Sequence, residues 1–471
     1  MSQQNRGAEN PKAIAHISVD RLFGTRTYVI PPPTVDPKRT SSLLLLYGDN
    51  GSGKTTVLRM LYSLLSPSRK GGFKSFLART PFASFSVSFA DGTTLAAVRS
   101  GSELVGSFEL SLTYPDSTSI VMPMIANSDN TIGLQPGEQE REYPQFLARV
   151  RELGIALYYL SDDRRLQILH RPDTSTDEEE DLVLRYSRSG RMVREHVRTS
   201  AFERLYVDDQ EPRGLSLQPS IEAFEAWTRQ HALRASNRGE GNTNTIYADL
   251  IRRITSAYGP RVEPSSATEL DDLRKRLAAI AARSRSFVEF GLISQPPVDE
   301  LVSEMSRVDD RSQPIVSRVL APYIEGLEAR LNALQELRDV LTTIVQNLND
   351  LYTGKTVTFT LRRGLRVVTE DGGELVPEFL SSGEKQLLVL LCNTVIARDQ
   401  TSIFVIDEPE LSLNVKWQRK LVRTLLEGVA GSAVQFILAT HSIELLSAYS
   451  DNVVKLESRE WRSLNAAQSA S

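Results

Sequence analysis

Residues 43–56 read LLLLYGDNGSGKTT and carry the strongest structural signal in the chain. The apolar run 43–47 is typical of a strand buried in a parallel sheet. A glycine-rich loop follows at residues 48–53, and the apolar spacing of residues 57–65 is helical. A strand, a loop and a helix in this order predict an α/β layer.

The loop also has a chemical signature, because residues 48–55 satisfy the pattern G-x-x-x-x-G-K-[ST]. Phosphate groups need backbone amides that point inward, which a glycine-rich turn permits, and the helix N-terminus adds its positive dipole. In this pattern Lys54 would reach the β- and γ-phosphates and Thr55 would bind Mg²⁺. The predicted phosphate-binding residues are Asn50, Gly51, Ser52, Gly53, Lys54, Thr55 and Thr56.

Two further apolar runs end in polar residues. Residues 403–406 are followed by Asp407, which would hold the metal through water, and by Glu408, which would polarise the attacking water. A buried strand that simply ends in acidic turn residues is the alternative. Residues 434–439 end at His441, near the strand ends where ligands of α/β sheets bind. His441 would contact the γ-phosphate, although a capping histidine is the simpler interpretation.

The sequence LSSGEKQ at residues 380–386 precedes an apolar helix at residues 387–397. Ser381 or Ser382 is a good N-cap, and a helix cap is the simple interpretation of the motif. The functional alternative is a second anion-binding helix N-terminus.

Three parts of the chain differ in periodicity. Residues 13–30, 82–122 and 155–160 have strand character, and the period of two at residues 82–122 predicts an antiparallel β layer. Residues 219–352 have helical spacing, with expected breaks at residues 239–241, 259–260, 295–297 and Pro314. An apolar stripe over residues 320–351 requires a partner helix, and packing within a helical subdomain is favoured over a free coiled coil. The expected segments are residues 1–212, 213–352 and 353–471.

Composition restricts the class of protein. The 471 residues are 40% apolar and 24% charged, which is ordinary globular usage. The single cysteine, Cys392, excludes an internal disulfide and fits a reducing compartment, so we expect a cytoplasmic protein. No apolar run is long enough for a membrane span, and the five scattered histidines do not have the spacing of a zinc site.

Taken in order, GDNGSGKTT, LSSGEKQ, FVIDEPELSLN and ATHS resemble the motifs of ABC-type ATPases of the SMC, RecF and OLD group. Within that group the chain is similar to the ATPase subunits of bacterial anti-phage systems such as PARIS and Septu. The resemblance implies a P-loop ATPase head of mixed sheets, interrupted by a helical insertion, which uses ATP and Mg²⁺ and dimerises around ATP. The signature of one copy would cap the γ-phosphate bound by the other through Ser381, Ser382, Gly383 and Glu384.

The resemblance also makes Glu408 the catalytic glutamate, His441 the switch histidine and residues 411–414 the D-loop. Some positions depart from the pattern: Ser382 and Glu384 replace the Gly and Gln of transporters, and Asn414 replaces an expected His. The candidates for the glutamine loop are Asp162, Asp163 and Arg164. Phe23 is a candidate for adenine stacking, with a core phenylalanine as the alternative.

The expected function is an ATP-driven sensor or scaffold in phage defence that holds or releases a separate effector. Only residues 442–471 follow His441, too few for the nuclease domain of OLD proteins, so we expect a nuclease effector on another chain. A phage protein or DNA is the candidate trigger. The alternative is a DNA-binding repair ATPase like RecF; the ATPase of a membrane transporter is disfavoured by the insertion and by the SMC-like signature.

Overall fold

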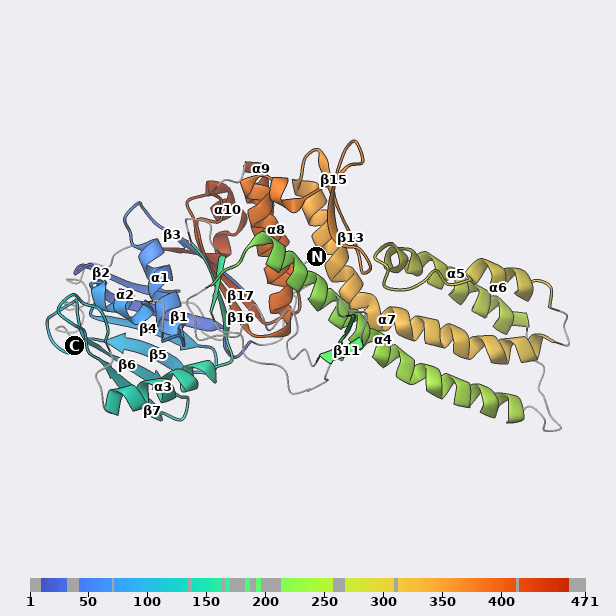
Figure 1. Cartoon of the computed structure of the whole chain (residues 1–471), viewed down its shortest axis with the longest axis horizontal. Coiled ribbons are helices and arrows are strands. Elements are labelled where there is room, and N and C mark those ends of the chain that lie inside the picture. The colour runs from blue at the N-terminus through green and yellow to red at the C-terminus, as the bar shows by residue number, and fades with distance from the viewer. Residues whose placement is uncertain are drawn as a thin grey trace. The chain divides into compact units, whose positions relative to one another are not determined.

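The computed structural model describes residues 10–31, 42–69, 72–133, 138–161, 166–169, 183–186, 192–195, 213–256, 267–308, 312–411 and 415–456. The chain forms two compact units (Figure 1). The first contains Met1–Ser220 and Ser381–Ser471, and the second contains Ile221–Leu380. The segment boundaries expected at residues 212/213 and 352/353 stay a prediction.

A seven-stranded sheet forms the centre of the first unit. Its strand order is β12 (Arg213–Gly214), β9 (Leu166–Leu169), β8 (Ala156–Leu160), β16 (Ser402–Asp407), β17 (Val434–Ala439), β3 (Leu43–Tyr47) and β18 (Val453–Lys455). The five strands from β8 to β18 are parallel, whereas β9 and β12 add antiparallel pairs at one edge. Every residue of β8, β16 and β17 is buried, as expected for parallel strands covered on both faces.

Helices cover both faces of this sheet. Helix α1 (Lys54–Leu65) lies on one side of β16 and β17, and α8 (Ser382–Ile396) and α9 (Val415–Gly428) lie on the other (Figure 1). On the α8 side, the Phe404 ring stacks on Tyr158 with 4.2 Å between centroids, and Phe436 lies 5.2 Å away. The apolar runs of the sequence are therefore sheet strands with two buried faces.

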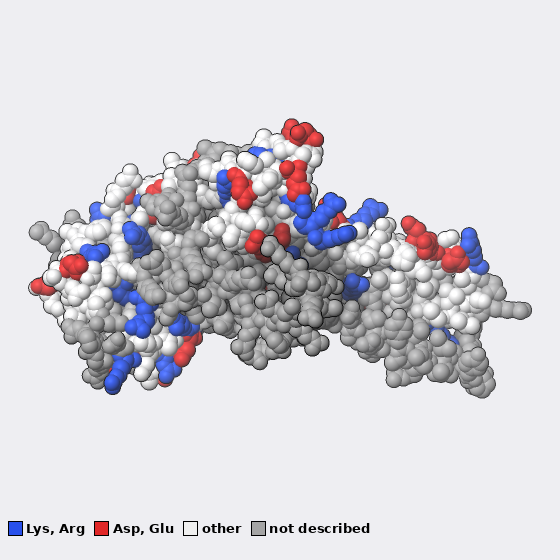
Figure 2. Space-filling view, viewed as in Figure 1, with Lys and Arg blue, Asp and Glu red and all other residues white. Residues whose placement is uncertain are grey.

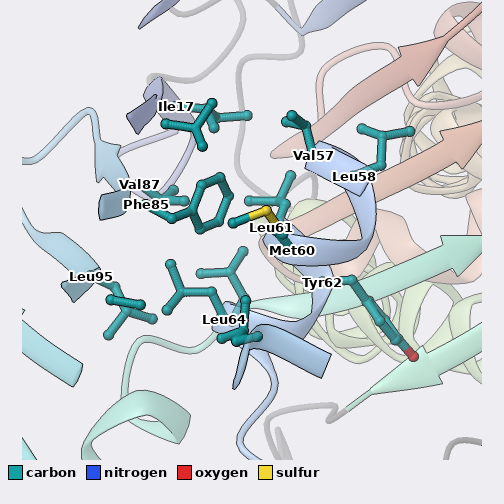
Figure 3. Packing of buried hydrophobic residues seen from close by; sticks show 14 of the residues in the cluster. Ile17, Val57, Leu58, Met60, Leu61, Tyr62, Leu64, Phe85, Val87 and Leu95 are labelled. Carbon is teal, nitrogen blue, oxygen red and sulfur yellow. The ribbon is translucent and has the colours of Figure 1, made fainter. Parts of the chain in front are cut away.

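An antiparallel sheet packs against the outer side of α1. Its strand order is β2 (Arg26–Ile30), β1 (Ile14–Leu22), β4 (Ser84–Phe89), β5 (Thr94–Val98), β6 (Phe108–Thr113) and β7 (Ser119–Met124). Figure 3 shows Val57, Leu61 and Leu64 of α1 close to Phe85 and Leu95 of this sheet. Alternate residues of β4 and β6 are buried, which confirms the predicted antiparallel layer and the mixed α/β fold class.

Shorter elements complete the first unit. They are helices α2 (Phe73–Arg79), α3 (Glu138–Arg151) and α10 (Ile443–Ala448), the strand pair β10 (Val183–Tyr186) and β11 (Met192–Glu195), and the 3₁₀ turns η3 (Ala397–Asp399) and η4 (Ser450–Asn452). No helix among the described residues is long and apolar enough to cross a membrane.

The second unit is mainly helical. It contains most of α4 (Leu217–Ser256), then α5 (Ala267–Glu289), α6 (Val298–Met305), α7 (Gln313–Leu351), the strands β13 (Lys355–Thr360), β14 (Gly364–Thr369) and β15 (Glu374–Leu375), and the turn η2 (Pro377–Phe379). The apolar stripe of α7 packs against α5 and β13. Arg276 of α5 donates two hydrogen bonds, of 3.0 and 2.7 Å, to Glu328 of α7.

One of the expected helix breaks is wrong. Helix α4 runs through residues 239–241 without interruption. Each glycine costs about 1 kcal/mol relative to alanine in a helix, which a long helix can absorb. The breaks at residues 295–297 and at Pro314 are confirmed, because α6 begins at Val298 and Pro314 lies in the first turn of α7. The break expected at residues 259–260 lies outside the described residues.

The C-terminal end of α1 is fastened by a buried lysine. The Lys74 ammonium donates hydrogen bonds to the carbonyl oxygens of Ser63 (2.6 Å), Leu64 (3.0 Å) and Ser66 (3.1 Å). Burial lowers the pKa of Lys74 from 10.5 to about 7. Three orphan carbonyls of a helix end are thereby satisfied by one side chain.

This lysine predicts a pH dependence of stability. Between pH 7 and 10 the unfolded chain holds a proton on Lys74 that the folded chain has lost, so the free energy of unfolding should rise with pH by about 1 kcal/mol per unit. Denaturant unfolding of wild type and Lys74→Met at several pH values isolates this contribution, because the variant lacks the titrating group. A difference between the two proteins that is constant from pH 7 to 10 would contradict it.

Candidate functional site

Three neighbouring parallel strands, β16, β17 and β3, end at the same edge of the sheet. Asp407, the last residue of β16, pairs with Ala439 of β17, and Ala439 pairs with Leu46 of β3. Beyond the strands, Glu408 N donates to Ala439 O (2.9 Å) and Thr440 N donates to Leu46 O (3.1 Å). The predicted phosphate loop, the acidic pair and the segment carrying His441 therefore meet at the same sheet edge.

The glycine loop adopts a backbone that other residues resist. Gly51 and Gly53 have φ of 77° and 94°. A Cβ on Gly53 would lie 3.0 Å from Leu22 Cδ2 and 3.3 Å from the Phe23 ring, so the loop touches the β1–β2 turn. Glycine at position 53 is required both by backbone angle and by space.

The β1–β2 hairpin holds the loop from outside. The Tyr28 hydroxyl donates to Ser52 O at 2.9 Å, and the Arg26 guanidinium donates to Gly51 O. Because both carbonyl oxygens accept hydrogen bonds from the hairpin, they are not available to face a bound anion. Sequence reasoning missed both residues, because they lie in a separate strand with no motif of its own.

Phe23 lies at the tip of the same hairpin, beside Gly53. Its side chain is 44% exposed, and the Arg26 guanidinium lies 5.8 Å from its ring centroid. An exposed aromatic face beside the phosphate loop fits the predicted role in adenine stacking better than the core alternative does. The role itself stays a prediction.

Lys54 places a buried positive charge in the site. It is only 6% exposed, and its ammonium donates to Gly48 O (2.8 Å) and Asp49 O (3.3 Å). Burial lowers the pKa of Lys54, and the negative charges of Glu408, Asp407, Asp49 and Glu410 act in the opposite direction. One buried ammonium near four carboxylates leaves a net negative charge, which makes the site receptive to an added cation such as Mg²⁺.

The residues present fit a phosphate and a magnesium ion. Ser52 Oγ is buried at the head of α1 and makes no hydrogen bond within the described part of the chain. Thr55 is exposed, whereas Asp407 is 2% exposed at the end of β16. The described residues contain no cluster of three metal-ligating side chains. Magnesium on a nucleotide does not need one, since phosphate oxygens and water complete its shell.

Glu408 occupies a strained position. Its φ is 47°, in the left-handed region, although it is not a glycine. Its carbonyl accepts a hydrogen bond from Leu411 N at 3.0 Å, which closes a turn immediately after β16. Strain of this kind costs of order 1 to 3 kcal/mol and is concentrated at functional sites. The turn sets the direction in which the Glu408 side chain leaves the strand.

Glu410 is a second residue that sequence reasoning missed. Its Oε1 accepts hydrogen bonds from Thr440 Oγ1 (2.8 Å), His441 N (2.7 Å) and Ser442 N (3.1 Å). The only signal was its place two residues after Glu408, in the sequence DEPE. His441 is thus held through its backbone by a carboxylate from the neighbouring loop.

The LSSGEKQ motif begins α8 as a complete capping box. Ser381 is the N-cap: its side chain accepts from Glu384 N, and Glu384 Oε2 accepts from Ser381 N at 2.8 Å. Ser381 and Ser382 are exposed, whereas Gly383 and Glu384 are buried. The capping interpretation is confirmed, and a phosphate contact made by this motif stays a prediction.

Several predicted positions lie outside the described residues. They are the glutamine-loop candidates Asp162, Asp163 and Arg164, and residues 412–414 of the expected D-loop, including Asn414.

Comparison with known proteins identifies a family. The family model described as "AAA domain, putative AbiEii toxin, Type IV TA system" matches residues 43–447. No curated protein matches the sequence.

Three solved structures of Smc heads are similar to this chain. One, derived from Pyrococcus furiosus, has an extended coiled coil and is bound to the C-terminal domain of ScpA (12% identity, 97% of this chain and 98% of that chain, TM-score 0.35). Another is an Smc head bound to the C-winged helix domain of ScpA (12% identity, 96% and 99%, TM-score 0.33). A third, derived from Pyrococcus yayanosii, has a coiled coil and joint (14% identity, 95% and 95%, TM-score 0.34).

The geometry of Gly53 makes a specific prediction. Gly53→Ala should weaken ATP binding by at least roughly tenfold, because the methyl group displaces the loop from the β1–β2 turn and strains the backbone. Gly431→Ala is the matched control: Gly431 has φ of 80°, with open space around its Cβ position, and lies in the turn before β17. Titration with a fluorescent ATP analogue should show normal affinity for the control, and equal affinity of both variants would contradict the assignment.

Proposed function

The chain belongs to the AAA-domain family of the AbiEii toxin type, and on this basis we propose that it is an ATPase whose nucleotide lies at the common edge of β3, β17 and β16. The observation that carries the proposal is the shared register of the three strands. It places the glycine loop, Asp407 with Glu408, and His441 at one edge in a single chain.

Binding would depend on the loop and on Lys54. The amides of residues 50–55 and the unbonded Ser52 hydroxyl would receive the phosphates, with Thr56 in the same helical turn. The Lys54 ammonium would exchange its bonds to Gly48 O and Asp49 O for phosphate oxygens. Thr55 and Asp407 would hold Mg²⁺, which neutralises phosphate charge when bound.

Hydrolysis would depend on Glu408 and His441. Glu408 leaves the strained turn after β16 and would orient water for in-line attack on the γ-phosphate. His441 leaves the adjacent strand end and would contact the γ-phosphate from the side of β17.

At the biological level we propose a switch in phage defence. Two copies would close on ATP, with Ser381, Ser382, Gly383 and Glu384 of one copy facing the phosphates held by the other. The support is the exposed position of Ser381 and Ser382 at a capped helix N-terminus and the motif order shared with anti-phage ATPases. The family description, which names a toxin of a toxin-antitoxin system, fits a chain that acts together with a second protein, here a separate effector nuclease.

A DNA-binding repair ATPase is the second candidate, and one surface feature favours it. Arg362 and Arg363 are exposed at the turn between β13 and β14, where Arg366 pairs with Glu374. Figure 2 shows Lys and Arg side chains gathered over this part of the second unit. Such a group of cations would bind a phosphate backbone.

Two substitutions test the ATPase. Lys54→Ala should abolish ATP binding and hydrolysis, because it removes the cation that meets the phosphates. Glu408→Gln should bind ATP normally, lose hydrolysis by roughly 100-fold or more, and shift to a dimer with ATP. Lys12→Ala is the control, since Lys12 pairs with Asp91 outside the site. Phosphate release and light scattering measure the two effects, and normal turnover by either site variant would refute the assignment.

The DNA-binding alternative has its own test. If the turn between β13 and β14 binds DNA, the double variant Arg362→Ala, Arg363→Ala should lower the slope of log affinity against log salt by about 1 per arginine. Filter binding of duplex DNA at several salt concentrations measures this slope. Wild-type protein that binds no DNA at low salt, with or without ATP, would exclude this candidate.

A further inference from the structure

We propose that Glu410 is a positioning residue that sets the place of His441 and couples it to the segment that follows β16. The proposal rests on the ATPase function proposed above and adds a residue to which no motif assigns a role. It starts from a single carboxylate oxygen that joins two loops at the edge of the sheet.

That oxygen accepts hydrogen bonds from three consecutive residues, 440–442. Glu410 Oε1 accepts from Thr440 Oγ1 at 2.8 Å, His441 N at 2.7 Å and Ser442 N at 3.1 Å. Hydrogen bonds to an ionised acceptor are about twice as strong as neutral ones. The backbone of residues 440–442 therefore cannot move without breaking contacts to Glu410.

The same turn is tied on its other side. Ser442 N also donates to Thr440 Oγ1 at 3.0 Å, and Ser442 Oγ donates to Gln418 Oε1 of α9 at 3.0 Å. Ser442 then caps α10 by accepting from Leu445 N at 3.4 Å. The segment that carries His441 is thus a fixed turn between α9, α10 and Glu410.

Glu410 is equally fixed at its own end. It lies inside the turn closed by Leu411 N and Glu408 O (3.0 Å), and Glu408 N donates to Ala439 O at the end of β17 (2.9 Å). Two links therefore join the loop after β16 to the loop after β17, one through backbone and one through the carboxylate. Any shift of the first loop is passed to the His441 backbone.

The chain continues from this point into residues 411–414, the expected D-loop. Glu410 is placed to connect the segment that follows β16 with the backbone of His441.

The test compares Glu410→Ala with Glu427→Ala, a carboxylate of α9 that pairs with Arg423 away from the site. Glu410→Ala should lower kcat by roughly 10- to 100-fold through misplacement of His441, with KM for ATP little changed. Glu410→Gln should recover most of kcat, since its amide oxygen can accept the same hydrogen bonds. Glu427→Ala should match wild type.

A double-mutant cycle shows whether Glu410 acts through His441. In a His441→Ala background, Glu410→Ala should lower kcat by less than about threefold further. Additive losses would overturn the proposal, as would a normal kcat for Glu410→Ala or a loss of kcat that follows a loss of folded protein. If Glu410→Ala does not fold, Glu410→Asp replaces it, since its shorter side chain cannot reach all three donors and should lower kcat about tenfold.

The proposed ATPase function and the proposed role of Glu410 can be refuted separately. Wild-type protein that does not hydrolyse ATP would refute the proposed function. Wild-type protein that hydrolyses ATP, together with a Glu410→Ala variant that equals it, would refute only the role of Glu410.

Discussion

Parallel pairing of β3, β17 and β16 in one register is the constraint on which the site depends. Because Asp407, Ala439 and Leu46 are aligned, three loops from distant parts of the sequence begin at the same edge of the sheet. A shift by one residue would turn Phe404 or Phe436 toward the opposite face of the sheet and would move the three loops out of line. The hydrophobic core and the site geometry are therefore set by the same pairing.

Charge at this edge is arranged around a buried ammonium. Lys54 donates to two carbonyls of its own loop and feels the negative charge of four carboxylates, whereas the buried Ser52 hydroxyl makes no hydrogen bond within the described residues. A triphosphate with Mg²⁺ brings both signs of charge and can replace these contacts without leaving the lysine or the acids unpaired. The strained turn at Glu408 and the carboxylate of Glu410 then hold the flanking loops in place.

The sequence predicted those features that have a local cause. The runs 43–47, 403–406 and 434–439 are strands because continuous apolar residues suit a sheet buried on both faces, and the alternation at residues 82–122 suits a sheet with one buried face. The contacts of Tyr28, Arg26 and Glu410 could not be predicted, since they depend on which loops the topology brings together. The continuous α4 was missed because local glycine propensity is weaker than the cooperativity of a long helix.

The central claim is that the common edge of the three strands receives the phosphates of ATP. A crystal structure of the wild-type chain with Mg²⁺ and a non-hydrolysable ATP analogue tests it most directly. In that structure Lys54 Nζ should leave the carbonyls of Gly48 and Asp49 and contact phosphate oxygens, with Glu408 and His441 on either side of the γ-phosphate. A nucleotide bound elsewhere, with Lys54 still bonded to its own loop, would contradict it.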